Sequence, residues 1–305
     1  MKKICLAESL EKALKAHDAW LGNDNEESVN PAELPLDITR LSYWFPKIKA
    51  AGLQVPETCI IKTTEKELKD IFRSMESSRR DGVYSLAKRI GEAIELADGI
   101  DYPCFLRTDH FSGKHDWERT CFVQNGESIA EHIMAIAYMW ECMNMFGPPC
   151  DVWVIREFLP TKPVGVCHSY GDMPICREFR FFVEDGDIKC WHPYWPVKAL
   201  NDGNAKYHGA FDYNAFCRID DPQELQKLFD LASKAGATLS GSWSVDLLET
   251  QRGWFVTDMA EAHKSWHWEG CVKRHHEKID DPAKFVVTEI EQVRVKELES
   301  AHASS

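Results

Sequence analysis

Two aspartates in the last third of the chain are the residues best suited to chemistry. The stretch Trp243–Glu261 is predicted to form two strands joined by a short turn at Gln251–Gly253, with Asp246 and Asp258 one on each strand among apolar neighbours. Carboxylates are costly to bury without a partner, so two that lie side by side need a cation. Magnesium takes a few carboxylates together with phosphate oxygens, which favours a nucleotide site. The alternative is a surface hairpin whose acids face water, because such alternation is common on half-buried strands.

Three basic residues could neutralise the phosphates of a nucleotide. Arg107 ends one apolar strand and Arg180 lies within another, where a charge without a partner would be costly. The guanidinium fork can bind phosphate oxygens in pairs. Lys114 lies in a loop of small residues and could reach the outer phosphates as a mobile point charge. The alternative for each is a surface charge or an ion pair with a nearby acid.

The composition indicates a folded protein of one large or two modest domains. The 305 residues are 44% hydrophobic and 11% aromatic, and the net charge of -13 argues against a general nucleic-acid binder. Eleven cysteines without any C-x-x-C pair favour reduced thiols over a disulfide framework. We find no signal peptide and no run long enough to span a membrane. We therefore expect a soluble, cytoplasmic protein without membrane partners.

The pattern of helices and strands predicts an α+β protein. Helix-like and strand-like segments alternate as far as a break at Gly147–Asp151, and mostly strands follow, with a hairpin turn at Glu184–Asp187. We expect an N-terminal helical segment (1–50), a small lobe (51–150), a large lobe (151–280) and a C-terminal helix and tail (281–305). Residues 195–215 are expected to form a polar loop. Two lobes of this kind leave a natural cleft between them.

Five segments, in this order, resemble the motifs of the ATP-grasp family. They are Gly52–Thr58 before a strand, Tyr102–Thr108 with the loop Ser112–His115, the strand Trp153–Leu159, the strand and hairpin Glu178–Ile188, and the hairpin with two aspartates. The resemblance implies the ATP-grasp fold, with an ATP cleft between a small α/β lobe and a larger antiparallel-sheet lobe. Within the family, the loop and the last two motifs are most similar to assembly chaperones of translation initiation factor 2 and their bacterial and viral relatives.

The resemblance also implies a role for each candidate residue. ATP would be bound by Arg107, Lys114, Glu157, Phe158, Leu159 and Arg180, with Glu157–Leu159 as the hinge against adenine. Magnesium would be bound by Asp246, Asp258 and Glu261. Arg180 and Lys114 would also assist the reaction. Relatives usually place an asparagine two residues after the last acid, but here that position is Ala260. Glu261 points to the opposite face of the strand and can join Asp258 only if the strand ends or bulges there.

Two activities follow from the resemblance, both with ATP and magnesium as cofactors. The first is a ligase that phosphorylates a carboxylate and joins the acyl group to an amine or thiol. The second is a protein that binds ATP with little turnover and docks a protein client. The sequence names neither the carboxylate, the amine nor the client, because acceptor pockets are built from variable loops.

Overall fold

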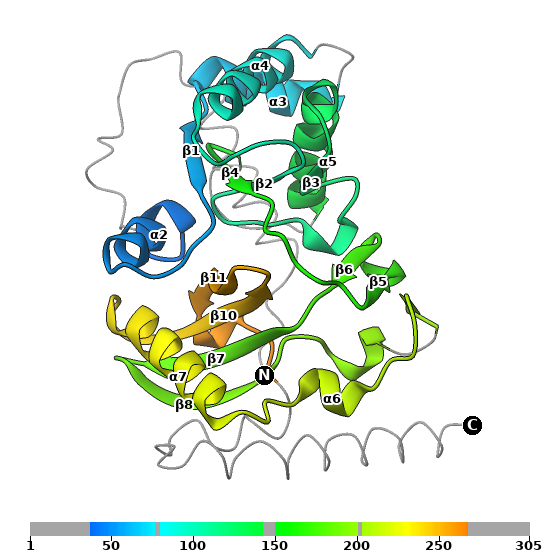
Figure 1. The fold of residues 1–305 in the computed structure, drawn as a ribbon. Helices are drawn as coiled ribbons and strands as arrows, with labels where there is room; N and C mark the ends of the chain where they lie inside the picture. Colours follow the sequence, from blue (N-terminus) through cyan, green and yellow to red (C-terminus); the bar gives the residue numbers. More distant parts are fainter. Residues whose placement is uncertain (1–36, 77–79, 143–149, 201–202, 268–305) are drawn as a thin grey trace, which may run out of the picture.

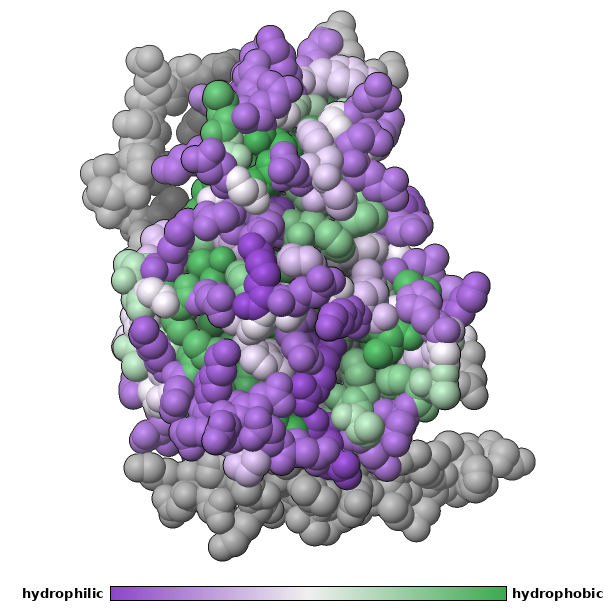
Figure 2. Space-filling model, viewed as in Figure 1, coloured by the Kyte–Doolittle hydropathy of each residue, from purple (hydrophilic) through white to green (hydrophobic). Residues whose placement is uncertain are grey.

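The structure is a computed structural model that describes residues 37–76, 80–142, 150–200 and 203–267. Helices and antiparallel sheets make up this part of the chain, which confirms the predicted α+β class (Figure 1). Residues 1–36 of the predicted N-terminal helical segment (1–50) and the predicted C-terminal helix and tail (281–305) lie outside the described residues. No described helix has both the length and the apolar character that a membrane span requires. The face in view is mostly hydrophilic, and apolar residues appear there in separate areas (Figure 2).

The upper lobe in Figure 1 is a four-stranded antiparallel sheet in the order β1-β4-β2-β3, covered by three helices. The strands are β1 (Thr58–Lys62), β2 (Cys104–Thr108), β3 (Phe122–Val123) and β4 (Val152–Glu157). The helices are α3 (Glu65–Glu76), α4 (Asp81–Leu96) and α5 (Ile129–Cys142), and their apolar faces form one core with the sheet. Although β4 follows the break at 147–151, it pairs with β1 and β2, so this sheet continues to Glu157.

Thr64 with Glu67 three residues later is the sequence pattern of a capping box, and a capping box begins α3. The amide of Thr64 donates to Glu67 Oε2 at 2.8 Å, and the amide of Glu67 donates to Thr64 Oγ1 at 3.2 Å. Two backbone donors at the start of the helix are thereby satisfied.

The lower lobe is a second antiparallel sheet, in the order β11-β10-β7-β8. Its strands are β7 (Glu178–Glu184), β8 (Asp187–Pro193), β10 (Ser242–Thr250) and β11 (Gly253–Glu261). Helix α7 (Pro222–Ala237) and the early helix α2 (Leu41–Ala50) contribute to the same apolar core as this sheet. The α2 segment therefore packs with the lobe that is far from it in sequence.

A small third sheet lies beside the lower lobe, with the strand order β6-β5-β9. It consists of β5 (Gly165–Cys167), β6 (Met173–Ile175) and β9 (Ala205–Tyr207). The predicted loop 195–215 thus contains a strand, β9, and the start of the short helix α6 (Tyr213–Cys217). The sequence does not reveal these pieces because three-residue strands carry almost no periodic signal and depend on distant partners.

Candidate functional site

A cleft lies between the two lobes, lined by β2, β4 and the start of the following loop above, and by β7, β10 and β11 below. Its lining combines an apolar set of side chains with a charged set. The apolar set is Pro56, Phe105, Trp117, Phe158, Leu159, Met173, Pro174, Cys176 and Leu248. The charged set is Arg107, Lys114, Arg156, Glu157, Glu178 and Asp258. A ligand with a flat apolar part and an ionic part would match this lining.

Asp246 and Asp258 lie side by side, as the hairpin pattern predicts. They are register partners on β10 and β11, and the turn between the strands lies at 251–252. The ladder pairs Leu247 with Val256, so Thr257 is an extra residue in β11 and forms a β-bulge directly before Asp258. Asp246 is almost completely buried, with 2% of its surface exposed.

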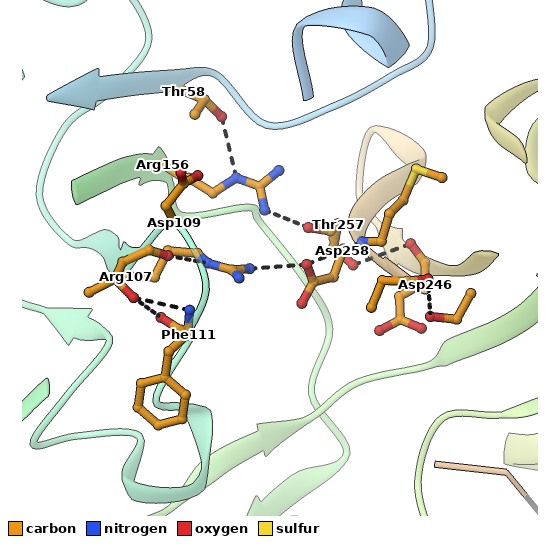
Figure 3. A network of polar contacts seen from close by, with 12 residues as sticks. Thr58, Arg107, Asp109, Phe111, Arg156, Asp246, Thr257 and Asp258 are labelled. Atoms are coloured by element: carbon orange, nitrogen blue, oxygen red, sulfur yellow. Dashed lines mark hydrogen bonds and ion pairs between the residues drawn. The ribbon is translucent and has the colours of Figure 1, made fainter. Parts of the chain in front are cut away.

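Each aspartate is paired with an arginine from a different strand. Arg180 on β7 donates from Nε and Nη2 to the two oxygens of Asp246, at 2.7 and 2.8 Å. Arg107 on β2 crosses the cleft and donates from Nη1 to Asp258 Oδ1 at 3.1 Å (Figure 3). Two carboxylates and two guanidinium groups therefore neutralise one another where the lobes meet.

Lys114 adds a further positive charge to this group. It begins a short 3-10 helix, Lys114–Asp116, directly after Gly113, whose φ of +67° lies in the left-handed region. Its Nζ lies 4.5 Å from the centre of the Tyr194 ring, and the guanidinium carbon of Arg180 lies 5.0 Å from the same centre. Burial lowers the pKa of Lys114, but Tyr194 and the nearby carboxylates, Glu178 first, raise it above its ordinary value. Lys114 is therefore charged at neutral pH.

Glu178 is a buried carboxylate that lines the cleft. It is 6% exposed, and its Oε1 lies 3.5 Å from Thr257 Oγ1, which donates to it. Burial, with the negative charges of Asp246 and Asp258, raises the pKa of Glu178 to about 7, although Lys114 and Arg180 act in the opposite direction. Glu178 can thus gain or lose a proton near neutral pH, and sequence analysis had used it only as part of a motif.

Arg156 is a functional candidate that the sequence analysis missed. It lies on β4, lines the cleft and is 4% exposed. Its Nη2 atom is buried without a hydrogen-bond partner, and no described carboxylate forms an ion pair with it. Burial and the positive charge of Arg107 lower its pKa to about 9. The sequence contains a signal for this residue, because Arg156 directly follows the apolar run 152–155. A charge at the end of or within an apolar strand is also the reason why Arg107 and Arg180 are predicted to be functional.

The segment Glu157–Leu159, the predicted adenine hinge, ends β4 of the upper sheet and leads toward β5 of the small third sheet. The Glu157 amide donates to the Glu57 carbonyl at 2.8 Å, and its carboxylate accepts an ion pair from Arg252 at 2.6 Å. Phe158 and Leu159 line the cleft, and neither has a backbone hydrogen-bond partner within the described part of the chain. These two residues can therefore offer main-chain groups to a ligand, whereas the Glu157 side chain is already engaged.

The loop that carries Lys114 is anchored on helix α2. Asp109 accepts hydrogen bonds from the Ser42 amide at 2.6 Å and from Ser42 Oγ at 2.7 Å, and its carbonyl accepts from the Leu41 amide at 3.1 Å. Asp109 thereby satisfies donors at the start of α2 from a distant part of the chain. The loop is held at its base without a row of glycines.

Glu261 has a different ion-pair partner from the two aspartates and lies outside the lining of the cleft. It ends β11 opposite Trp243, forms an ion pair with Lys264 at 2.7 Å, and does not line the cleft. Among the described residues, no group of three or more His, Cys, Asp or Glu side chains is placed to hold a metal ion. The oxygens of Asp246 and Asp258 are hard donors that suit magnesium in kind. Magnesium binding by these two residues and by Glu261 stays a prediction, and the structure adds no support for Glu261.

Comparisons with known proteins yield similar structures and no similar sequences. No family model and no curated protein matches the chain. Similar solved structures include Cdc123 from Schizosaccharomyces pombe, with 12% identity, a TM-score of 0.48, and 80% of this chain and 93% of that chain covered. They also include an N5-carboxyaminoimidazole synthase from Aspergillus clavatus in complex with ADP and 5-aminoimidazole ribonucleotide (14%, 0.46, 82% and 54%). A third is a RimK domain ATP-grasp protein from Sphaerobacter thermophilus (15%, 0.39, 78% and 63%). Because these TM-scores lie below 0.5, we base the functional proposal on the residues of the cleft.

Proposed function

We propose that this protein is an ATP-grasp ligase that binds ATP with magnesium in the cleft and activates a carboxylate for attack by an amine or thiol. One observation carries the proposal. Asp246 and Asp258 are register partners, each is paired with a guanidinium group, and Asp258 lines the cleft together with Lys114. A site with two carboxylates and two guanidinium groups side by side matches a ligand that consists of a metal cation and a polyanion, such as magnesium with ATP.

The ion pairs of the cleft can exchange partners when such a ligand enters. Without the ligand, Arg180 neutralises Asp246 and Arg107 neutralises Asp258. Asp246 and Asp258 would hold magnesium, which would neutralise them and supply positive charge for the phosphates. Arg107 and Arg180 are then free to donate to the phosphates, which match the guanidinium fork. The exchange would keep Asp246, Asp258 and their two arginines neutralised before and after binding.

The apolar lining suits the base of the nucleotide. Phe158, Leu159, Met173 and Leu248 offer flat and aliphatic surfaces, and the unpaired main-chain groups of Phe158 and Leu159 can bond the edge of adenine. This placement puts the base at the hinge and the phosphates toward Arg107 and Lys114.

The reaction of a ligase needs positioning and charge neutralisation from these residues. An oxygen of the acceptor carboxylate attacks the γ-phosphorus, and the bond to the bridging oxygen breaks to release ADP. The amine or thiol then attacks the acyl carbon, and inorganic phosphate leaves. Arg180 and Lys114 neutralise the charge that develops on the transferred group, so no nucleophile from the protein is required.

A second candidate function is an ATP-binding protein that docks a protein client with little turnover. The ion pair between Glu261 and Lys264 favours it, because the cleft then offers two metal-binding aspartates instead of three carboxylates. A site with fewer metal ligands can hold ATP firmly and still give weaker stabilisation of phosphoryl transfer.

Calorimetric titration with ATP and magnesium tests the proposal. We expect the parent protein to bind, Asp258→Asn to bind more weakly, and the exposed-acid control Asp98→Asn to bind like the parent. Folded parent protein that does not bind ATP would refute the proposed site. Release of ADP on addition of carboxylate and amine pairs would support the ligase, whereas firm ATP binding without ADP release would support the docking protein.

A further inference from the structure

Arg156 connects the two lobes at the strand that carries Asp258. It lies on β4 of the upper sheet, where Nε donates to Thr58 Oγ1 of β1 at 3.3 Å. Its Nη1 reaches β11 of the lower sheet and donates to the carbonyl of Thr257 (Figure 3). The residue that follows Thr257 is Asp258, so this bond lies one peptide away from a proposed metal ligand.

The carbonyl that Arg156 binds belongs to the β-bulge of β11. The ladder pairs Asp246 with Asp258 and Leu247 with Val256, and Thr257 has no partner. Its Oγ1 donates to the carbonyl of Asp246 at 3.3 Å, which ties the bulge to β10. A bulge turns the side chains that flank it, so the form of this one decides how Asp258 faces Asp246.

A structural ion pair does not explain Arg156. Its side chain is buried, no described carboxylate forms an ion pair with it, and the repulsion from Arg107 exceeds the attraction of Asp258. A buried guanidinium group in such surroundings is costly. The contacts that it makes are the Thr58 hydroxyl, the Thr257 carbonyl and the face of the Phe45 ring, whose centre lies 5.6 Å from the guanidinium carbon.

We propose that Arg156 is a positioning residue that holds the Thr257 bulge in the form that places Asp258 beside Asp246. Because this hydrogen bond joins β4 of the upper lobe to β11 of the lower lobe, the contact between the lobes and the affinity for magnesium should depend on each other. The inference rests on the proposed function, because it takes Asp258 to be a magnesium ligand. It differs from a direct contact between Arg156 and phosphate, which would act on ATP with or without the metal.

The test is calorimetric titration of ATP with magnesium and of ATP with EDTA. The ratio of the two affinities measures the contribution of the metal. Arg156→Met should lower this ratio about tenfold or more, as is typical when a residue that orients a metal ligand is removed. The affinity for ATP in EDTA should change less than about threefold. The matched control is Arg252→Met, which removes another arginine that joins the lobes, through Glu157, without touching the bulge, and its ratio should match the parent.

A second variant covers the case in which Arg156→Met does not fold. Thr257→Val keeps the shape of the side chain and removes the hydroxyl that ties the bulge to β10, and it should lower the ratio about threefold. An unchanged ratio in either folded variant would overturn the proposal. An equal loss of affinity with magnesium and with EDTA would overturn it too, and would assign Arg156 to the phosphates. If the ATP affinity of the parent protein does not depend on magnesium, the proposed metal site is refuted. This outcome needs no variant, so it is distinguishable from a failure of the proposal for Arg156.

Discussion

The two aspartates should contribute very differently to the stability of the ligand-free protein, although both serve the same proposed metal. Asp246 accepts two charged hydrogen bonds from Arg180, at 2.7 and 2.8 Å, and its side chain is 3% exposed. Asp258 accepts one from Arg107, at 3.1 Å, and its side chain is 25% exposed. Asp246→Asn leaves a buried guanidinium without its counter-charge, which costs about 3 kcal/mol. Asp258→Asn also removes the counter-charge of a buried guanidinium, that of Arg107, but this group lines the cleft, where water can reach it, and keeps its bond to the Thr108 carbonyl at 3.0 Å, so we expect a cost of about 1 kcal/mol.

Urea denaturation in the absence of nucleotide measures this difference. The expected gap of about 2 kcal/mol corresponds to a roughly thirtyfold difference in the unfolding equilibrium. In Asp246→Asn combined with Arg180→Met, no charge is left unpaired, so this double variant should be more stable than Asp246→Asn alone. Calorimetric titration should show that both single variants lose the magnesium-dependent part of ATP binding.

Two results would refute this reasoning. If Asp258→Asn destabilises the protein as much as Asp246→Asn, then the number of hydrogen bonds to each aspartate and its burial do not determine the loss of unfolding free energy. If the double variant is less stable than Asp246→Asn, the unpaired charge of Arg180 is not the source of the loss.

Three further predictions concern other parts of the cleft. Because the pKa of Glu178 is raised to about 7 from its ordinary 4.5, the folded protein holds this proton more tightly than the unfolded chain, and the free energy of unfolding should fall as the pH rises from about 4.5 to about 7. Glu178→Gln should remove this fall, and parallel pH profiles for parent and variant in urea denaturation would contradict it. Leu248→Trp should fill the apolar part of the cleft and abolish ATP binding in calorimetry, whereas Leu96→Trp, at a residue that is 85% exposed, should bind like the parent. Asp109→Asn should lower the free energy of unfolding by about 1 kcal/mol because it weakens the cap that Ser42 receives, and an unchanged urea midpoint would count against that cap.

The sequence by itself determined the features that depend on neighbours along the chain. Thr64 and Glu67 form their capping box within one helical turn, and the hairpin that carries Asp246 and Asp258 closes through a short turn. The predicted turn Gln251–Gly253 would by itself pair Asp246 with Asp258, whereas in the structure the turn is shorter by one residue and the bulge at Thr257 restores this pairing. The costly position of Arg107 in an apolar strand likewise marked it as a residue that needs a partner.

Only the tertiary structure decided which groups meet across the cleft. Arg180 and Asp246 are 66 residues apart and Arg107 and Asp258 are 151 apart, and no spacing in the sequence encodes either pair. The role of Arg156 was equally invisible, because it depends on a bulge in β11 and on the distance between two sheets. Hydrophobic period and turn chemistry act over a few residues, whereas the order of strands in a sheet and the approach of two lobes follow from packing of the whole chain. The sequence could therefore identify most charged residues of the site, whereas the role of Arg156, the raised pKa of Glu178 and the pairing of all these groups followed from the fold.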